Sequence, residues 1–141
     1  MTSAGRADPR IARGFNRLAP LYDAMADIGF AGRIHASQTT LLPRLPKVRR
    51  ALVLGGGTGR FLASFLSHDP SARVVSIDAS PGMTRMASAR VASEGHSNRV
   101  ELRVGGLEKL GPDERFDLVV THCFLDLFEE LELEGVRQVV R

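Results

Sequence analysis

The residues best suited to chemistry are a glycine-rich segment and the first carboxylate after the next apolar stretch. Residues 55–59 read G-G-G-T-G after one apolar run, and Asp78 follows a second apolar run. Glycine lets a backbone approach a ligand closely at a helix start, and an acid after the neighbouring strand can accept hydrogen bonds from ribose hydroxyls. The spacing therefore predicts a nucleoside site whose contacts are Gly55, Gly56, Gly57, Thr58, Gly59 and Asp78.

Two simpler explanations exist for these residues: the glycines could form only a tight turn, and Asp78 could only cap a helix. Three alternate glycines exceed what a turn needs, and Ser80 already fits the cap position, so we favour ligand contact. The spacing also differs from the dinucleotide fingerprint G-x-G-x-x-G/A, because the sixth position is Arg60 or Leu62. A nicotinamide-dependent oxidoreductase is therefore disfavoured.

The composition fits a single domain. The chain has 141 residues, of which 43% are hydrophobic, and a formal net charge of +3. A lone Cys123 excludes an internal disulfide, and no spacing is typical of a zinc site. The N-terminus lacks an apolar signal core and no apolar run reaches membrane-spanning length, so a cytoplasmic protein is expected. The densest basic cluster comprises Arg44, Lys47, Arg49 and Arg50. No aromatic residues lie between these charges, which favours a solvated loop opposite the glycine segment over a phosphate-binding site.

Hydrophobic periodicity predicts alternating strands and helices after an N-terminal helical part. Helical spacing covers about residues 10–26 and 30–42, and Pro43 and Pro46 then mark a linker. Ser80 and Pro81 are typical of a helix start, and Gly95 is typical of a helix end. The later elements are strands near 50–54, 73–77, 99–104 and 116–121, helices at 58–67 and from 80 to about 95, and a final helix near 129–140.

This alternation predicts an α/β fold with a doubly wound, Rossmann-like, mostly parallel sheet. Strand 99–104 alternates polar and apolar residues whereas the first two strands are apolar throughout, so it belongs at an edge. The edge position favours strand order 3-2-1-4, with the progression reversing between the first and fourth strands. Ligands bind outside the carboxyl ends of the strands at such a reversal. The glycine segment, Asp78, residues 105–106 and residues 121–124 should therefore meet there.

Four motifs follow one another along the chain. They are the glycine segment with Asp78, the stretch D-x-S-x-x-M at 78–83, the strand-four stretch F-D-L-V-V at 116–120, and an N-terminal F-x-x-x-A-x-x-Y-D at 15–23. Together they resemble class I S-adenosylmethionine (SAM) methyltransferases of the ubiquinone/menaquinone-biosynthesis type, methyltransferase types 11 and 25, over nearly the whole chain. The resemblance implies SAM as the cofactor. It adds the cofactor contacts Ala79, Met83, Gly106, Leu107, Thr121 and Tyr22, with helix packing as the alternative for Tyr22.

The sequence departs from the family pattern at three places. The acid usually found two residues before the glycines is Val53; Val53→Asp should be tolerated if this side chain faces the crevice and should unfold the domain if it faces the core. The usual acid after strand three, which holds the adenine amino group, is Gly106, and Glu108 could replace it only if the loop bends back. The chain also ends at Arg141, short of the family's seven-stranded sheet. We therefore expect a helical cap and linker at residues 1–48 and a SAM-binding core, truncated after strand four, at residues 49–141.

The expected function is SAM-dependent methyl transfer to an unidentified small-molecule acceptor. Proximity, orientation and desolvation suffice for this reaction, so no catalytic side chain needs to be visible in the sequence. His122, with Asp126 one helical turn later, is a weak candidate for a general base, and a structural histidine is the simpler interpretation. The alternative function is a non-catalytic remnant or interaction module that keeps the nucleoside-binding fold.

The expected partners follow from the same features. Strand four, with Leu118, Val119 and Val120, should form an exposed sheet edge, because its normal neighbour would come later in the chain. The last helix should carry an apolar stripe that includes Val139 and Val140. We expect a small-molecule substrate and self-association through the strand-four edge, but neither nucleic acid nor a membrane span.

Overall fold

Strands and helices alternate through the described part of the molecule, as expected. The structure, a computed structural model, describes residues 36–121 and 138–140. Its elements are β1 (Arg50–Leu54), α3 (Arg60–His68), β2 (Arg73–Asp78), α4 (Pro81–Ser93), β3 (Val100–Val104) and β4 (Leu118–Thr121), with 3-10 helices at Leu42–Arg44, Ser97–Arg99 and Leu107–Lys109.

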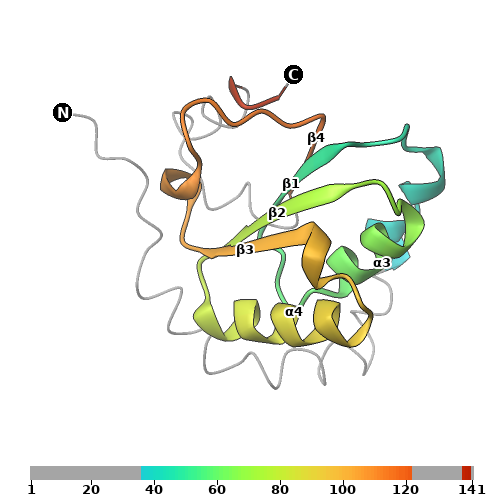
Figure 1. Ribbon diagram of the computed structural model, residues 1–141, viewed down its shortest axis with the longest axis horizontal. Helices are drawn as coiled ribbons and strands as arrows, with labels where there is room; N and C mark the ends of the chain where they lie inside the picture. Colours follow the sequence, from blue (N-terminus) through green and yellow to red (C-terminus); the bar gives the residue numbers. More distant parts are fainter. Residues whose placement is uncertain (1–35, 122–137, 141) are drawn as a thin grey trace.

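The four strands form one parallel sheet in the order β3-β2-β1-β4 (Figure 1), which confirms the predicted topology and the edge position of β3. Strand β1 is central: its Leu54 lies opposite Ile77 of β2 and Thr121 of β4. The chain runs from β1 through β2 to β3 and then returns to the far side of β1. The reversal therefore falls between β1 and β4, where a ligand is expected at the carboxyl ends.

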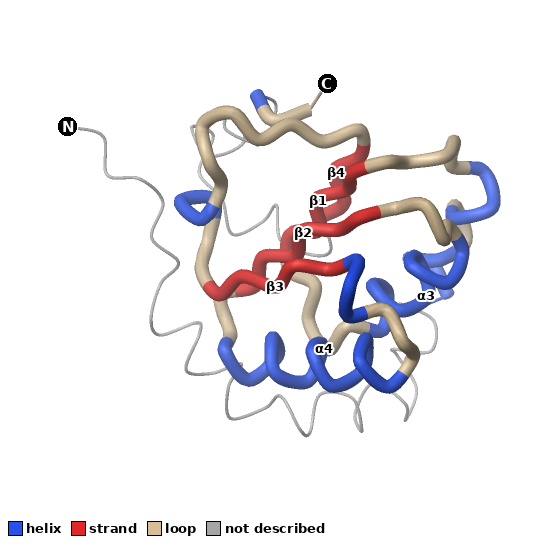
Figure 2. The backbone as a smooth tube through the Cα atoms, viewed as in Figure 1, coloured by secondary structure: helices blue, strands red, loops and turns tan. Residues whose placement is uncertain are grey.

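The sheet buries apolar side chains on both faces, because successive residues of a strand point to opposite sides. Helices α3 and α4 lie on the same side of the sheet (Figure 2) and share one core with it. Ala51 and Val53 belong to this core, together with Phe61 and Leu62 of α3 and Ala87 of α4. The opposite face carries a second core, made of Leu52, Leu54, Val75, Ile77, Phe116 and Val139.

Helix α3 begins two residues later than predicted. Gly59 has φ 84° and ψ 9°, a left-handed conformation that a right-handed helix does not contain, so the helix starts at Arg60 rather than at Thr58. The end agrees with the prediction, because Asp69 has an extended backbone and stops the helix before Pro70. The glycine segment is therefore a longer loop than its sequence suggested.

Helix α4 begins and ends as predicted. The Ser80 hydroxyl accepts a hydrogen bond from the Met83 N–H at 3.2 Å, and Pro81 occupies the first helical position. Gly95 follows the helix with φ 75°, the left-handed conformation common after a helix end. Pro43, in contrast, lies within the 3-10 helix Leu42–Arg44 and not in an extended linker.

The beginning of β4 differs from the prediction. The strand starts at Leu118, and Phe116 forms an isolated parallel bridge with Val140. The Phe116 N–H also donates to the Val139 carbonyl at 2.8 Å. Val140 therefore pairs with extended backbone, and its prediction as a helical residue is wrong. The sheet edge beside Phe116 is paired by residues 139–140.

Several predictions concern residues outside the described part. They include the helix at 10–26, most of the helix at 30–42, most of the final helix, and the candidate residues Tyr22, His122 and Cys123. Within the described part, no helix has the length and apolar character needed to cross a membrane.

Candidate functional site

The glycine loop, residues 55–59, joins β1 to α3 at the carboxyl edge of the sheet. Gly55, Gly57 and Gly59 have φ values of 71°, 58° and 84°, which residues with side chains rarely adopt. A Cβ at Gly57 would meet no atom of the described residues within 4 Å, whereas a Cβ at Gly59 would lie 2.7 Å from Ala87 Cα. Gly59 thus permits the close approach of α4, and Gly57 leaves room in front of the loop.

Asp78, at the end of β2, is bonded into this loop. Its Oδ2 accepts the Gly57 N–H at 2.9 Å, and its Oδ1 accepts the Ser80 N–H at 2.8 Å. Burial raises the pKa of the Asp78 carboxyl, and the two backbone hydrogen bonds oppose that rise. Each carboxylate oxygen has a second acceptor position, so Asp78 has capacity for ribose hydroxyls while it holds the loop.

Arg90 on α4 also contacts the loop, and the sequence reasoning missed it. Its Nε donates to the Thr58 carbonyl at 3.1 Å. A signal was present in the sequence, because Arg90 shares a helical stripe with the buried Met83 and Ala87. An arginine beside such a stripe requires a hydrogen-bond acceptor nearby.

In the loop after β3, the Glu108 side chain turns toward the backbone two residues before it. The Gly106 N–H donates to Glu108 Oε1 at 2.9 Å. The same oxygen would lie 2.7 Å from a Cβ at Gly105, whose φ is 144°. Glu108 therefore brings a carboxylate to the loop that lacks the family's acid, and its contact with a ligand stays a prediction.

The parallel register brings the predicted segments to one edge. Leu54 lies opposite both Ile77 and Thr121, and Asp78 lies opposite Val104, so the loops after β1, β2 and β3 and the end of β4 follow one another across the sheet. The other predicted contacts in this region are either buried, namely Thr58 and Met83, or half-buried, namely Ala79 and Leu107.

The model of a family described as "Methyltransferase domain" matches residues 51–141, which is more than half of the chain. The chain belongs to this family of class I SAM-dependent methyltransferases. The resemblance predicted from the four motifs is thereby confirmed.

Curated relatives of this methyltransferase domain carry several names. The ubiquinone/menaquinone biosynthesis C-methyltransferase UbiE of Ectopseudomonas mendocina is 31% identical over 115 residues, covering 78% of this chain and 44% of the relative. The malonyl-[acyl-carrier protein] O-methyltransferase of Priestia megaterium is 27% identical over 122 residues, covering 86% of this chain and 43% of the relative. The chain therefore spans less than half the length of these relatives.

Solved structures show the same fold. The N-methyltransferase NodS from Bradyrhizobium japonicum, in complex with S-adenosyl-L-homocysteine (SAH), superposes with a TM-score of 0.73 at 18% identity, covering 92% of this chain and 67% of NodS. The O-methyltransferase TomG from Streptomyces achromogenes, in complex with SAM, superposes with a TM-score of 0.63 at 20% identity, covering 92% of this chain and 60% of TomG. At these identities the likeness concerns the fold.

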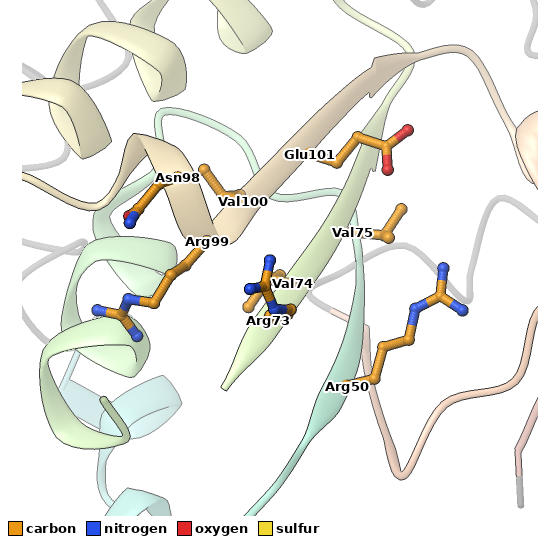
Figure 3. A pocket seen from close by; sticks show the side chains of 8 residues that line it. All are labelled: Arg50, Arg73, Val74, Val75, Asn98, Arg99, Val100 and Glu101. Carbon is orange, nitrogen blue, oxygen red and sulfur yellow. The ribbon is translucent and has the colours of Figure 1, made fainter. Parts of the chain in front are cut away.

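The methyltransferase domain has a cavity of about 240 Å³ at the opposite, amino edge of the sheet (Figure 3). Arg50, Arg73 and Arg99 line it from neighbouring strands and the segment before β3. The Arg99 guanidinium hydrogen-bonds to backbone carbonyls at the C-terminal end of α3. Its Nη2 donates to the Leu66 carbonyl at 2.8 Å and its Nη1 donates to the Asp69 carbonyl at 3.0 Å. Three residues of the basic cluster, Arg44, Lys47 and Arg49, are exposed, as predicted for a solvated loop.

Glu114 links three parts of the methyltransferase domain near this edge. Its carboxylate accepts two hydrogen bonds from Arg103 on β3, at 2.7 and 2.9 Å, and one from Arg50 on β1. It also accepts the Gly111 N–H at 2.8 Å. The Arg103 hydrogen bonds are the main cause that lowers the pKa of Glu114 from 4.5 to about 2.

The lowered pKa of Glu114 predicts a loss of stability in acid. Since the pKa is lower in the folded protein than in the unfolded chain, the stabilisation is complete above pH 4.5 and is lost as the pH falls toward 2. We expect about 1–2 kcal/mol, because solvent screens this near-surface group. Urea unfolding of the parent, Glu114→Gln and the neighbouring control Asp113→Asn between pH 6 and pH 3 measures it.

The variants must be compared because Asp78 changes the free energy of unfolding with pH in the direction opposite to Glu114. The raised pKa of Asp78 makes the folded state less stable once the carboxyl ionises, so the Asp78 contribution improves as the pH falls. Glu114→Gln should therefore flatten the acid loss relative to both the parent and Asp113→Asn. An equally steep loss in Glu114→Gln would show that Glu114 is not its source.

Proposed function

We propose that this methyltransferase binds SAM at the carboxyl edge of its sheet and transfers the methyl group to a small-molecule acceptor. The observation that carries the proposal is the hydrogen bond between Asp78 and the Gly57 N–H, next to the open space in front of Gly57. It supports a site in which a carboxylate faces ribose hydroxyls while a bare backbone faces the rest of the nucleoside.

The same contacts favour SAM over a dinucleotide. A pyrophosphate needs free N–H groups and a positive potential at the glycine turn. Here the N–H groups of Gly55, Gly57 and Gly59 donate to Ile77 O, Asp78 Oδ2 and Gly56 O respectively. SAM carries no phosphate and therefore does not require these N–H groups to be free.

SAM, when bound, supplies an electrophilic methyl group that an acceptor nucleophile attacks in line with the departing sulfur. The protein has to bind the two reactants, orient them and exclude water from them. These tasks do not require a particular catalytic side chain. The relative named for ubiquinone/menaquinone biosynthesis supports a small organic acceptor, whereas the relative named for malonyl-[acyl-carrier protein] supports an acyl group carried on a protein. We propose His122 as the candidate for a general base.

Calorimetric titration with SAH and with NAD tests the cofactor proposal. We expect heat from SAH and none from NAD. Asp78→Ala should weaken SAH binding by about 1.5–3 kcal/mol, the typical contribution of hydrogen bonds to a charged group. The exposed Asp113→Ala is the matched control and should leave the affinity unchanged. Tight NAD binding without SAH binding would contradict the proposal, and SAH binding without methylation of any acceptor would favour a non-catalytic module.

A further inference from the structure

We infer that Arg90 is a positioning residue that holds the glycine loop in the conformation that receives the cofactor. The inference rests on the proposed SAM site, because Arg90 acts on the loop. The half-buried Arg90 side chain extends from α4, and its Nε donates to the Thr58 carbonyl at 3.1 Å. Thr58 lies within the loop, between Gly57, which faces open space in the described part of the chain, and Gly59, which packs against Ala87 of α4.

The hydrogen bond from Arg90 orients a whole peptide unit. A peptide is planar and trans, so the Thr58 carbonyl and the Gly59 N–H point in opposite directions. The Gly59 N–H donates to the Gly56 carbonyl at 3.2 Å, and this bond closes the turn that contains Gly57. By fixing the Thr58 carbonyl, Arg90 fixes the peptide plane on which that turn depends.

Arg90 and Asp78 hold the turn through opposite charges from two different elements. The Asp78 carboxylate on β2 accepts the Gly57 N–H, and the Arg90 guanidinium on α4 donates to the Thr58 carbonyl. Hydrogen bonds to charged groups are stronger than those between neutral groups. The backbone between the two contacts is therefore held at both its donor and its acceptor side.

The positioning effect is separable from the packing of α4. Met83, Ala87 and Val91 are each 2% exposed and bury the helix whatever residue stands at position 90. The loss of the Arg90 hydrogen bond should therefore free the loop while the core remains packed. A purely structural arginine would instead change stability without changing the loop.

The test compares Arg90→Ala and Arg90→Lys with Arg85→Ala, an exposed arginine on the same helix. The first measurement is amide hydrogen exchange of Gly57 and Gly59 in the ligand-free full chain, and the second is SAH affinity by calorimetry. We expect Arg90→Ala to speed both exchange rates and to weaken SAH binding, each about tenfold, the effect of one charge-assisted hydrogen bond. Lysine should restore part of both losses, and Arg85→Ala should match the parent.

Equal exchange rates and equal SAH affinities in Arg90→Ala and Arg85→Ala would overturn the inference. If Arg90→Ala fails to fold, Arg90→Gln is measured in the same way against the same control. If the parent itself does not bind SAH, the proposed function fails, while the exchange rates of Gly57 and Gly59 still decide whether Arg90 positions the loop.

Discussion

Val53→Asp is expected to unfold the domain. Val53 is 0% exposed and shares a core with Phe61 and Leu62 of α3. The new carboxylate would therefore be buried among apolar side chains, away from water. Burying an unpaired charge costs at least about 4 kcal/mol, a large part of the stability of a small domain. Far-ultraviolet circular dichroism and urea unfolding measure the loss.

Leu41→Asp provides the matched control for the added charge. Leu41 is 60% exposed, so the same carboxylate there should change the free energy of unfolding by less than about 0.5 kcal/mol. A Val53→Asp protein that unfolds at the same urea concentration as the parent would mean that Val53 faces the ligand crevice. The family's acid could then be restored at this position.

Gly59→Ala should destabilise the domain by about 3 kcal/mol, through backbone strain and overpacking. The φ of 84° is costly for any residue with a side chain, and the new Cβ would lie 2.7 Å from Ala87 Cα and 2.9 Å from its Cβ. These are atoms of a neighbouring helix that cannot move aside alone. Urea unfolding measures this cost.

Gly57→Ala is the matched comparison within the same loop. Its φ of 58° is also left-handed, but the new Cβ meets no atom of residues 36–121 or 138–140 within 4 Å, so we expect only the strain of about 1 kcal/mol. The methyl group would enter the space proposed for the cofactor, and SAH affinity should fall although the fold persists. If Gly57→Ala and Gly59→Ala cost the same stability, the close approach of α4 at Gly59 is not the reason for that glycine.

The sheet could be predicted because the burial of a strand determines its pattern of apolar and polar residues. A strand covered on both faces is mostly a continuous apolar run, as residues 51–54 of β1 and, apart from Ser76, 74–77 of β2 are, whereas the alternation in residues 99–104 identified the edge strand β3. The capping of α4 by Ser80 was predictable for a similar reason, because the cap and its partner are close in sequence.

Contacts between distant segments could not be predicted in the same way. The bond from Arg90 to Thr58 depends on how α4 packs over the loop, and the bridge between Phe116 and Val140 depends on a return of the chain. The late start of α3 depends on the φ of Gly59, which a glycine permits but does not require. In each case the deciding geometry is tertiary.

The hydrogen bonds described above for the glycine loop join residues of one stretch of the described chain, between Gly55 after β1 and Arg90 on α4. None of those hydrogen bonds requires a residue before Gly55 or after Arg90. The two curated relatives reported above match this region although one is named for ubiquinone/menaquinone biosynthesis and the other for malonyl-[acyl-carrier protein]. The proposed cofactor site is thus compact along the chain, and the choice of methyl acceptor could change through the other segments alone.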